Sequence, residues 1–437
     1  MAFPSKLTLN VHVARELLGL YRNLPFRADH VREIQRLKLR RLLHYAYERV
    51  LFYRKRMDDA GVHPSSVRDL DDLRRLPVLT KEEYRRYSQE EVAHAPGRYA
   101  NWARDATSGS SGTPLVLVHS WPERAYLIAK WLRAALVNGY RPTYRSFRMT
   151  SPVRLVPRDS VLQRAGLLRR RTISYSAPID QRVAAFLDAR PDFLYGNKTG
   201  ILELALEVKR RRLAVRHPRL YAVGGEVLDP HSMAIIWETF GKDNFFEFYG
   251  CEEMGTIGWQ RRGDDVLQYS HDTNILELDN HGTPGRDQGF AIMTDLHIRS
   301  MPLIRYRLGD WLETERRDGL AVIRRVGGGI NDWLIWADGS ASSHLPFYEL
   351  MATRSGAISQ FRVVQEAVDL VRIMVVLNPG VEFEPVRDDV IRTAKATIRP
   401  EVEYVVTRMD QMPAEHAAKI RMVESKVYRP GQPIRPA

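Results

Sequence analysis

Residues 106–114 form the stretch of the sequence best suited to hold a phosphate group, reading Ala-Thr-Ser-Gly-Ser-Ser-Gly-Thr-Pro. Gly109 and Gly112 allow backbone conformations in which successive N–H groups form an anion-binding concavity. Hydroxyl donors are added by Thr107, Ser108, Ser110, Ser111 and Thr113. The loop lacks the Gly-Lys-Ser/Thr ending of a Walker loop, which disfavours a P-loop ATPase. A flexible surface loop is the alternative interpretation.

A pair of acids follows an aromatic segment further along the chain. Residues 245–253 read Phe-Phe-Glu-Phe-Tyr-Gly-Cys-Glu-Glu, so Tyr249 and Gly250 precede the adjacent carboxylates Glu252 and Glu253. Mg²⁺ prefers one or two carboxylates together with phosphate oxygens, and acids beside a phosphate loop suit it. The alternative is a pair of solvated glutamates in the first turn of a helix, where acidic side chains are favoured.

Two further carboxylates end segments that resemble strands. Residues 220–226 end in Gly224, Gly225 and Glu226, and residues 301–310 end in a Gly-Asp pair that predicts a turn at Asp310. Open α/β sheets bind ligands where strands end in glycine-containing turns. An ionised carboxylate at Asp310 could accept two hydrogen bonds from a ribose diol, whereas a Gly-Asp turn without any ligand is also common.

The remaining pattern predicts the elements that position these groups. Helices are expected where apolar residues recur at helical spacing, and Thr80 with Glu83 has the spacing that starts a short helix. Residues 154–176 look irregular and basic. The alternation of short strands and helices predicts an α/β layer architecture. Helices are expected over residues 29–57, 121–137, 183–189 and 199–211, and strands over 115–118, 146–152, 191–196, 220–226 and 245–249.

The C-terminal region predicts a second, smaller unit. Residues 361–365 and 370–377 alternate as strands, residues 384–398 read as a helix, and residues 402–409 return to a strand. This order predicts a small α+β domain.

Composition narrows the classes of function. The chain has 437 residues, of which 44% are hydrophobic and 27% charged, with a formal net charge of +13. The basic runs at 169–171 and 209–212 are short, and no zinc-finger or RNA-recognition pattern accompanies them, so we expect phosphate-bearing small molecules and no nucleic acid. Cys251 is the single cysteine, which suits a reducing cytoplasm. No apolar segment reaches membrane-spanning length and residues 1–10 have no signal-peptide pattern, so we expect a cytoplasmic protein without a membrane partner.

The phosphate loop, the Tyr249-Gly250 segment with Glu253, and the segment ending in Asp310 occur in the order found in the adenylate-forming superfamily of acyl-CoA synthetases, which the chain resembles over nearly its whole length. Residues 36–53 and 69–84, with a Leu-Pro-Val-Leu-Thr-Lys core, are similar to the phenylacetate-CoA ligase branch and its relatives in capsule biosynthesis and deazaflavin-coenzyme adenylylation. Residues 107–114 resemble the capsule-type loop, in which threonine stands in place of the superfamily's usual lysine.

The resemblance implies a role for each matching position. Residues 107–113 would embrace the β- and γ-phosphates of ATP, Gly225 and Glu226 would lie beside adenine, and Tyr249 with Gly250 would lie near adenine or substrate. Glu253 would hold Mg²⁺, and Asp310 would bind the ribose hydroxyls. Lys419 matches the family's adenylation lysine, which would stabilise charge in the transition state. Serine and zinc chemistry are disfavoured, since no Gly-x-Ser-x-Gly frame or metal-ligand pattern is present.

The implied fold is a large N-terminal AMP-binding domain, residues 1–327, followed by a mobile C-terminal lid domain, residues 328–437. The implied activity is ATP-dependent activation of an aryl or small carboxylic acid as an acyl-adenylate, followed by transfer to coenzyme A. An amine acceptor, AMP transfer to a substrate hydroxyl, and a degenerate ATP-binding protein are the alternatives. Two departures from the family pattern, Gly329 in the hinge and Ala418 before the lysine, keep the last alternative open. A homodimer is the assembly considered for the chain.

Overall fold

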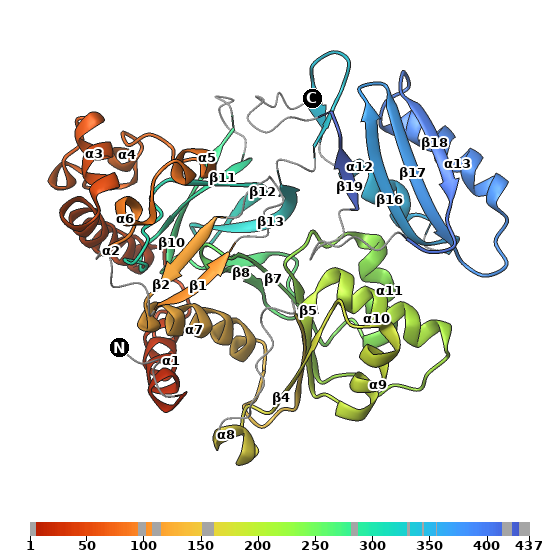
Figure 1. Ribbon diagram of the computed structural model, residues 1–437, viewed down its shortest axis with the longest axis horizontal. Helices are drawn as coiled ribbons and strands as arrows, with labels where there is room; N and C mark the ends of the chain where they lie inside the picture. Colours follow the sequence, from red (N-terminus) through yellow and green to blue (C-terminus); the bar gives the residue numbers. More distant parts are fainter. Residues whose placement is uncertain are drawn as a thin grey trace. The chain divides into compact units, whose positions relative to one another are not determined.

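The computed structural model describes residues 6–94, 102–106, 115–150, 161–280, 287–329, 333–342, 345–354, 356–412 and 422–427 (Figure 1). The phosphate loop, residues 107–114, and Lys419 lie outside this part of the chain. The chain divides into two compact units, residues 1–139 with 247–326 and residues 140–246 with 327–437.

The first unit combines N-terminal helices with an antiparallel sheet. Its strands lie in the order β10-β11-β12-β13-β9-β8-β7, and a separate hairpin joins β1 to β2, the two strands on either side of the phosphate loop. The helices are α1 (Lys6–Tyr21), α2 (Ala28–Arg49), α3 (Leu51–Asp59), α4 (Leu70–Leu73), α5 (Lys81–Arg85), α6 (Gln89–Val92) and α7 (Trp121–Val137). The strands are β1 (Ala103–Ala106), β2 (Val116–His119), β7 (Phe245–Cys251), β8 (Gly255–Gln260), β9 (Leu267–Tyr269), β10 (Asn274–Asp279), β11 (Gln288–Asp295), β12 (Tyr306–Arg317) and β13 (Leu320–Gly329).

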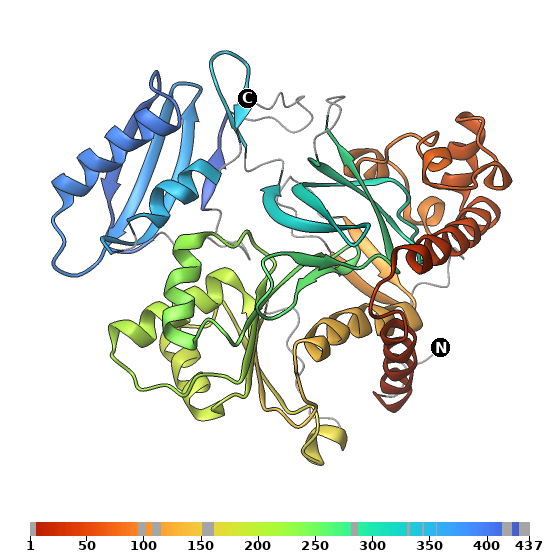
Figure 2. The ribbon, with the colours of Figure 1, turned by 180° about the vertical axis from the view of Figure 1, so that it is seen from behind.

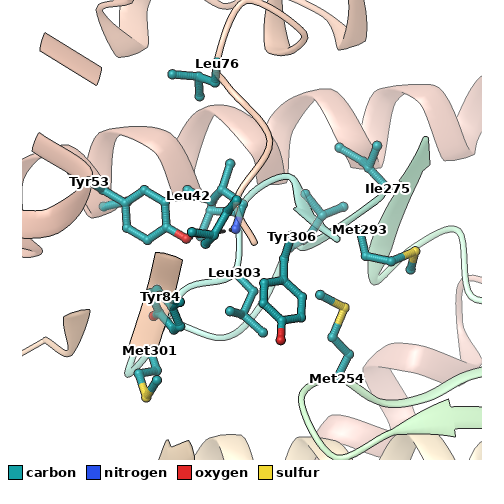
Figure 3. Close-up of a cluster of buried hydrophobic side chains, with 14 of the residues drawn as sticks. Leu42, Tyr53, Leu76, Tyr84, Met254, Ile275, Met293, Met301, Leu303 and Tyr306 are labelled. Atoms are coloured by element: carbon teal, nitrogen blue, oxygen red, sulfur yellow. Dashed lines mark hydrogen bonds between the residues drawn. The ribbon is translucent and has the colours of Figure 1, made fainter. Parts of the chain in front are cut away.

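Buried side chains in the core of the first unit pack its N-terminal helices against the segment just before β12 (Figure 3). The Tyr53 hydroxyl donates to the Pro302 carbonyl at 2.8 Å and accepts from the Ile304 N–H at 3.0 Å. Leu79 forms a parallel bridge with Tyr306. The chain just before α5 is therefore tied to the start of β12, and the predicted cap of α5 is confirmed, since the Thr80 hydroxyl accepts from the Glu83 N–H at 3.1 Å.

The second unit contains a parallel sheet with the order β6-β5-β3-β4. Helices alternate with these strands (Figure 2), and every residue of β6 is buried, as expected of a parallel strand covered on both faces. The elements are β3 (Ser146–Thr150), α8 (Val161–Arg164), β4 (Arg170–Ser174), α9 (Ile179–Ala189), β5 (Phe193–Asn197), α10 (Lys198–Arg210), β6 (Leu220–Gly224) and α11 (Pro230–Phe240).

The C-terminal part of the second unit forms a separate four-stranded sheet with the order β18-β17-β16-β19. Val390 and Ala394 of α13 are fully buried in one cluster with the strand residues Phe361 and Ile373, so the helix covers a face of this sheet (Figure 1). The elements are β14 (Leu334–Ile335), β15 (Ala341–Ser342), α12 (Leu345–Ala352), β16 (Ile358–Ala367), β17 (Leu370–Leu377), α13 (Phe383–Thr397), β18 (Glu403–Arg408) and β19 (Val423–Ser425). The expected α/β class with an α+β C-terminal region is confirmed.

Two expectations about local structure are wrong. Residues 154–176 include α8 and the edge strand β4, so the segment is not wholly irregular. Gly309 and Asp310 lie inside β12 and not in a turn that closes a strand. No helix in the described parts of the chain combines the length and the apolar character needed to cross a membrane.

Candidate active site

A tight connection between β7 and β8 carries the predicted magnesium ligand. Cys251 pairs with Gly255, so Glu252, Glu253 and Met254 form the connection. Gly255 has a positive φ of 65°, and a Cβ on Gly250 would overlap the backbone of Gly255. Gly250 is therefore required by the close approach of the two strands, and Gly255 by its positive φ. Glu252 and Glu253 lie in a hairpin connection, so they do not begin a helix.

Glu253 is largely buried in the first unit, with 8% of its surface exposed. Its Oε1 accepts a hydrogen bond from the Tyr306 hydroxyl at 3.3 Å and lies 3.7 Å from Nζ of Lys81. Its Oε2 has no protein partner within the described chain. Burial and the nearby Glu253 raise the pKa of Tyr306 well above its usual range, so this hydroxyl stays protonated and donates.

Tyr249 and Asp310, which the sequence suggested separately, are in direct contact. The Tyr249 hydroxyl donates to Oδ2 of Asp310 at 2.7 Å. Burial, followed by the charge of Asp310, raises the pKa of Tyr249 well above its usual range. The tyrosine is therefore a fixed donor that orients the carboxylate.

A bulge in β12 gives Asp310 its position. The pairs Phe290 with Trp311 and Ile292 with Arg307 enclose one residue of β11 but three residues of β12, the last being Asp310. Gly309 has a positive φ of 86°, which the extra residues require. The Gly-Asp pair thus marks a bulge in a continuing strand.

The end of β6 in the second unit carries the other predicted pair. Gly225 has a positive φ of 74° and turns the chain after β6. The Glu226 carboxylate accepts from the Asn197 amide and from both the backbone N–H and the hydroxyl of Thr199. Since Asn197 pairs with Gly224 across parallel strands, this contact joins the carboxyl ends of β5 and β6.

A buried ion pair supports the same loop. Lys198 and Asp229 are each 1% exposed, and Lys198 Nζ lies 2.8 Å from Asp229 Oδ2. Asp229 also caps α11 by accepting from the Ser232 N–H at 2.8 Å. The Glu226 carboxylate and, three residues later, Asp229 are therefore both held by partners in the second unit.

Sequence reasoning missed several residues of the site. Lys81 and Tyr306 were noted as parts of motifs, but neither was assigned to Glu253. Their contacts arise because the Leu79 bridge places the start of α5 beside β12. One sequence feature could have pointed to Lys81, which directly follows the Thr80 cap of a short helix. This feature does not predict which side chain Lys81 contacts.

Comparison with proteins of known function finds relatives of one kind. The chain is 36% identical over 320 residues to the phenylacetate-coenzyme A ligase of Escherichia coli, covering 65% of this chain and 68% of that enzyme. It is 28% identical over 302 residues to the phenylacetate-coenzyme A ligase of Thermus thermophilus, covering 64% of this chain and 65% of that enzyme. The chain therefore spans slightly less than two thirds of the second relative. No family model matches the chain.

Solved structures share the fold. The crystal structure of 2-hydroxyisobutyryl-CoA ligase in the postadenylation state has a TM-score of 0.75 at 20% identity and covers 92% of this chain and 90% of its own. That of an anthranilate CoA ligase in complex with anthranoyl-AMP has a TM-score of 0.56 at 16% identity, with coverage of 80% and 73%.

Proposed function

Because the chain belongs to the phenylacetate-coenzyme A ligase family, we propose that it activates an aryl or small carboxylic acid with ATP and transfers the acyl group to coenzyme A. Membership of this family confirms the branch that the sequence motifs suggested. The observation that carries the proposal is the hydrogen bond between Tyr249 and Asp310, two residues at motif positions of the family. Tyr249 lies four residues before Glu253 in the sequence. These groups give the first unit a polar site for a nucleotide.

The nucleotide would be held by groups whose geometry is already fixed. A carboxylate can accept several hydrogen bonds, so Asp310 can receive the ribose hydroxyls while it accepts from Tyr249. The backbone of Gly225 and Glu226 would lie beside adenine. Residues 107–113 would supply N–H and hydroxyl donors to the β- and γ-phosphates.

Glu253 fits the role of a magnesium ligand. It is one carboxylate with an oxygen, Oε2, that no described side chain occupies, and Mg²⁺ in nucleotide sites takes one or two carboxylates plus phosphate oxygens. No group of three or more acids, histidines or cysteines gathers to bind a metal in the described ranges, which agrees with a metal held partly by its nucleotide. When bound, Mg²⁺ would neutralise phosphate charge, and Lys81 would place a second positive charge nearby.

The chemistry would proceed in two balanced steps. A carboxylate oxygen of the substrate attacks the α-phosphorus of ATP in line, the bond to the bridging oxygen breaks, and pyrophosphate leaves. The thiolate of coenzyme A then attacks the acyl carbon, the thioester forms, and AMP leaves. Lys419, in a lid domain of residues 328–437, would stabilise the charge that develops in the first step.

ATP–pyrophosphate exchange over a panel of aryl, short-chain and amino acids tests this proposal. We expect exchange with one class of acid, lost in both Glu253→Gln and Lys419→Ala, and AMP release only after coenzyme A is added. Retention of AMP on the product would indicate nucleotidyl transfer to a hydroxyl, and ATP binding without exchange would indicate a degenerate protein. Either result would overturn the proposed reaction.

A further inference from the structure

The connection that carries Glu253 is held from behind by α7. A Cβ on Gly255 would lie 2.9 Å from Leu127 Cδ2, so this helix packs directly against the backbone of the connection. One turn further along the helix, Nζ of Lys130 donates to the Met254 carbonyl oxygen at 2.8 Å. Two successive turns of α7 therefore touch the residues that directly follow Glu253.

Burying the charged side chain of Lys130 in this position is unfavourable in free energy. It is fully buried, and burial of an ammonium group disfavours its charged form. Burial lowers the pKa of Lys130 to about 8, while the nearby Asp295 opposes the decrease. An apolar side chain of similar length would avoid this cost, and replacing buried ions by apolar groups is often neutral or stabilising.

The nearest buried charges also have partners other than Lys130. Oδ1 of Asp295 accepts from the backbone N–H groups of His297 and Ile298, both at 2.8 Å, and its other oxygen lies 3.9 Å from Lys130, beyond hydrogen-bond range. Arg133, the other buried cation of α7, forms two hydrogen bonds with Asp272 at 2.7 and 3.0 Å. The shortest contact of Lys130 is thus the one with the Met254 carbonyl, and the Asn274 side-chain amide can place its oxygen 3.3 Å from Nζ.

We propose that Lys130 is a positioning residue that fixes the Met254–Gly255 peptide, one residue beyond Glu253, and thereby aims the Glu253 carboxylate. Orienting the Met254 carbonyl restricts rotation of the residues beside it. Glu253 then keeps its contact with Tyr306 through Oε1 and leaves Oε2 for the metal. This inference rests on the proposed role of Glu253 in binding Mg²⁺ with the nucleotide.

The test compares Lys130→Met with Lys38→Met in the full chain. Lys38 is a matched control because its Nζ also donates to a backbone carbonyl, that of Asp272, at 2.7 Å, without touching the connection. Mn²⁺ binding is measured by electron paramagnetic resonance with ATP and without any acid substrate, and hydrogen exchange is followed at residues 252–256.

Outer partners of metal ligands typically change metal affinity by about 10- to 100-fold. We expect Lys130→Met to weaken Mn²⁺ binding by roughly that factor and to speed hydrogen exchange at the connection, and Lys38→Met to leave both unchanged. In the exchange assay, Lys130→Met should raise the Mg²⁺ concentration at half-saturation more than it lowers the maximal rate. If Lys130→Met does not fold, Lys130→Gln removes the charge and shortens the side chain, with the same expected result.

Normal Mn²⁺ affinity and normal hydrogen exchange in the folded Lys130 variant would overturn the inference. Equal losses in Lys38→Met would also overturn it, since they would indicate a general effect of the buried charges. Neither binding nor hydrogen exchange requires turnover. A wild-type protein that lacks ATP–pyrophosphate exchange would therefore contradict the proposed function while leaving the test of Lys130 intact.

Discussion

The variant Tyr249→Phe removes one hydroxyl and tests the hydrogen bond to Asp310 on which the proposed nucleotide site depends. This hydroxyl donates to Asp310 at 2.7 Å, and Tyr249 is 7% exposed. Hydrogen bonds to charged groups contribute about 1.5–3 kcal/mol. Because every 1.4 kcal/mol corresponds to about a tenfold change, we expect ATP and AMP to bind roughly 10- to 100-fold more weakly if the tyrosine acts by orienting Asp310 toward the ribose.

Calorimetry with ATP and with 2′,3′-dideoxy-ATP measures that effect as a coupling between the hydroxyl and the ribose. The wild-type protein should bind the dideoxy nucleotide more weakly, and Tyr249→Phe should cause little further loss with it. Tyr84→Phe is the matched control, since the Tyr84 hydroxyl donates to the Pro302 carbonyl at 3.2 Å and should affect stability alone. An equal loss for both nucleotides in Tyr249→Phe would refute the reasoning and indicate that the Tyr249 hydroxyl does not act through the ribose hydroxyls.

Two further predictions concern the buried charges of the first unit. Arg133→Met should destabilise the protein by about 3–5 kcal/mol, because Asp272 would lose its buried partner. Urea unfolding would measure this loss of stability, and a change below about 1 kcal/mol would contradict the prediction. Burial lowers the pKa of His271 from 6.5 to about 4, so the unfolded state binds the proton more readily and stability should fall as the pH decreases through this range. The full shift corresponds to about 3 kcal/mol, and His271→Phe should reduce the slope of unfolding free energy against pH; an unchanged slope would exclude His271 as its source.

Local sequence patterns correctly predicted helix α7, whose first residues include their own capping side chains. Helix α7 occupies the expected residues 121–137, since Ser120 and Glu123 form a capping box that begins it. Strand β4 was missed because its sequence, Arg-Arg-Thr-Ile-Ser, lacks an apolar run. It forms by parallel pairing with β3, which is a tertiary contact that local composition does not contain.

In the candidate site, local motifs likewise identified individual residues but not their contacts with residues far away in the sequence. Motifs identified Tyr249, Glu253 and Asp310 as functional candidates, and the structure brings Tyr249 to Asp310. The interpretation of Gly309 as part of a turn was wrong because a glycine with positive φ serves a turn and a bulge equally well, and only the register with β11 distinguishes them. The contacts of Lys81 and Lys130 were not predicted because their partners lie far away in the sequence.

One helix connects the segments that the proposed reaction requires. At the start of α7, Oε2 of Glu123 accepts from the backbone and hydroxyl of Ser120, directly after the hairpin strand that follows the phosphate loop. Its Oε1 accepts from the N–H groups of Arg299 and Ser300 at 2.6 and 2.8 Å, in the segment that leads to β12. Burial would raise the pKa of Glu123, but these hydrogen bonds hold it below its usual value. The same helix that carries Lys130 therefore also joins the end of the hairpin to the segment before the strand that carries Asp310. A displacement of α7 would disturb all three parts of the proposed nucleotide site together.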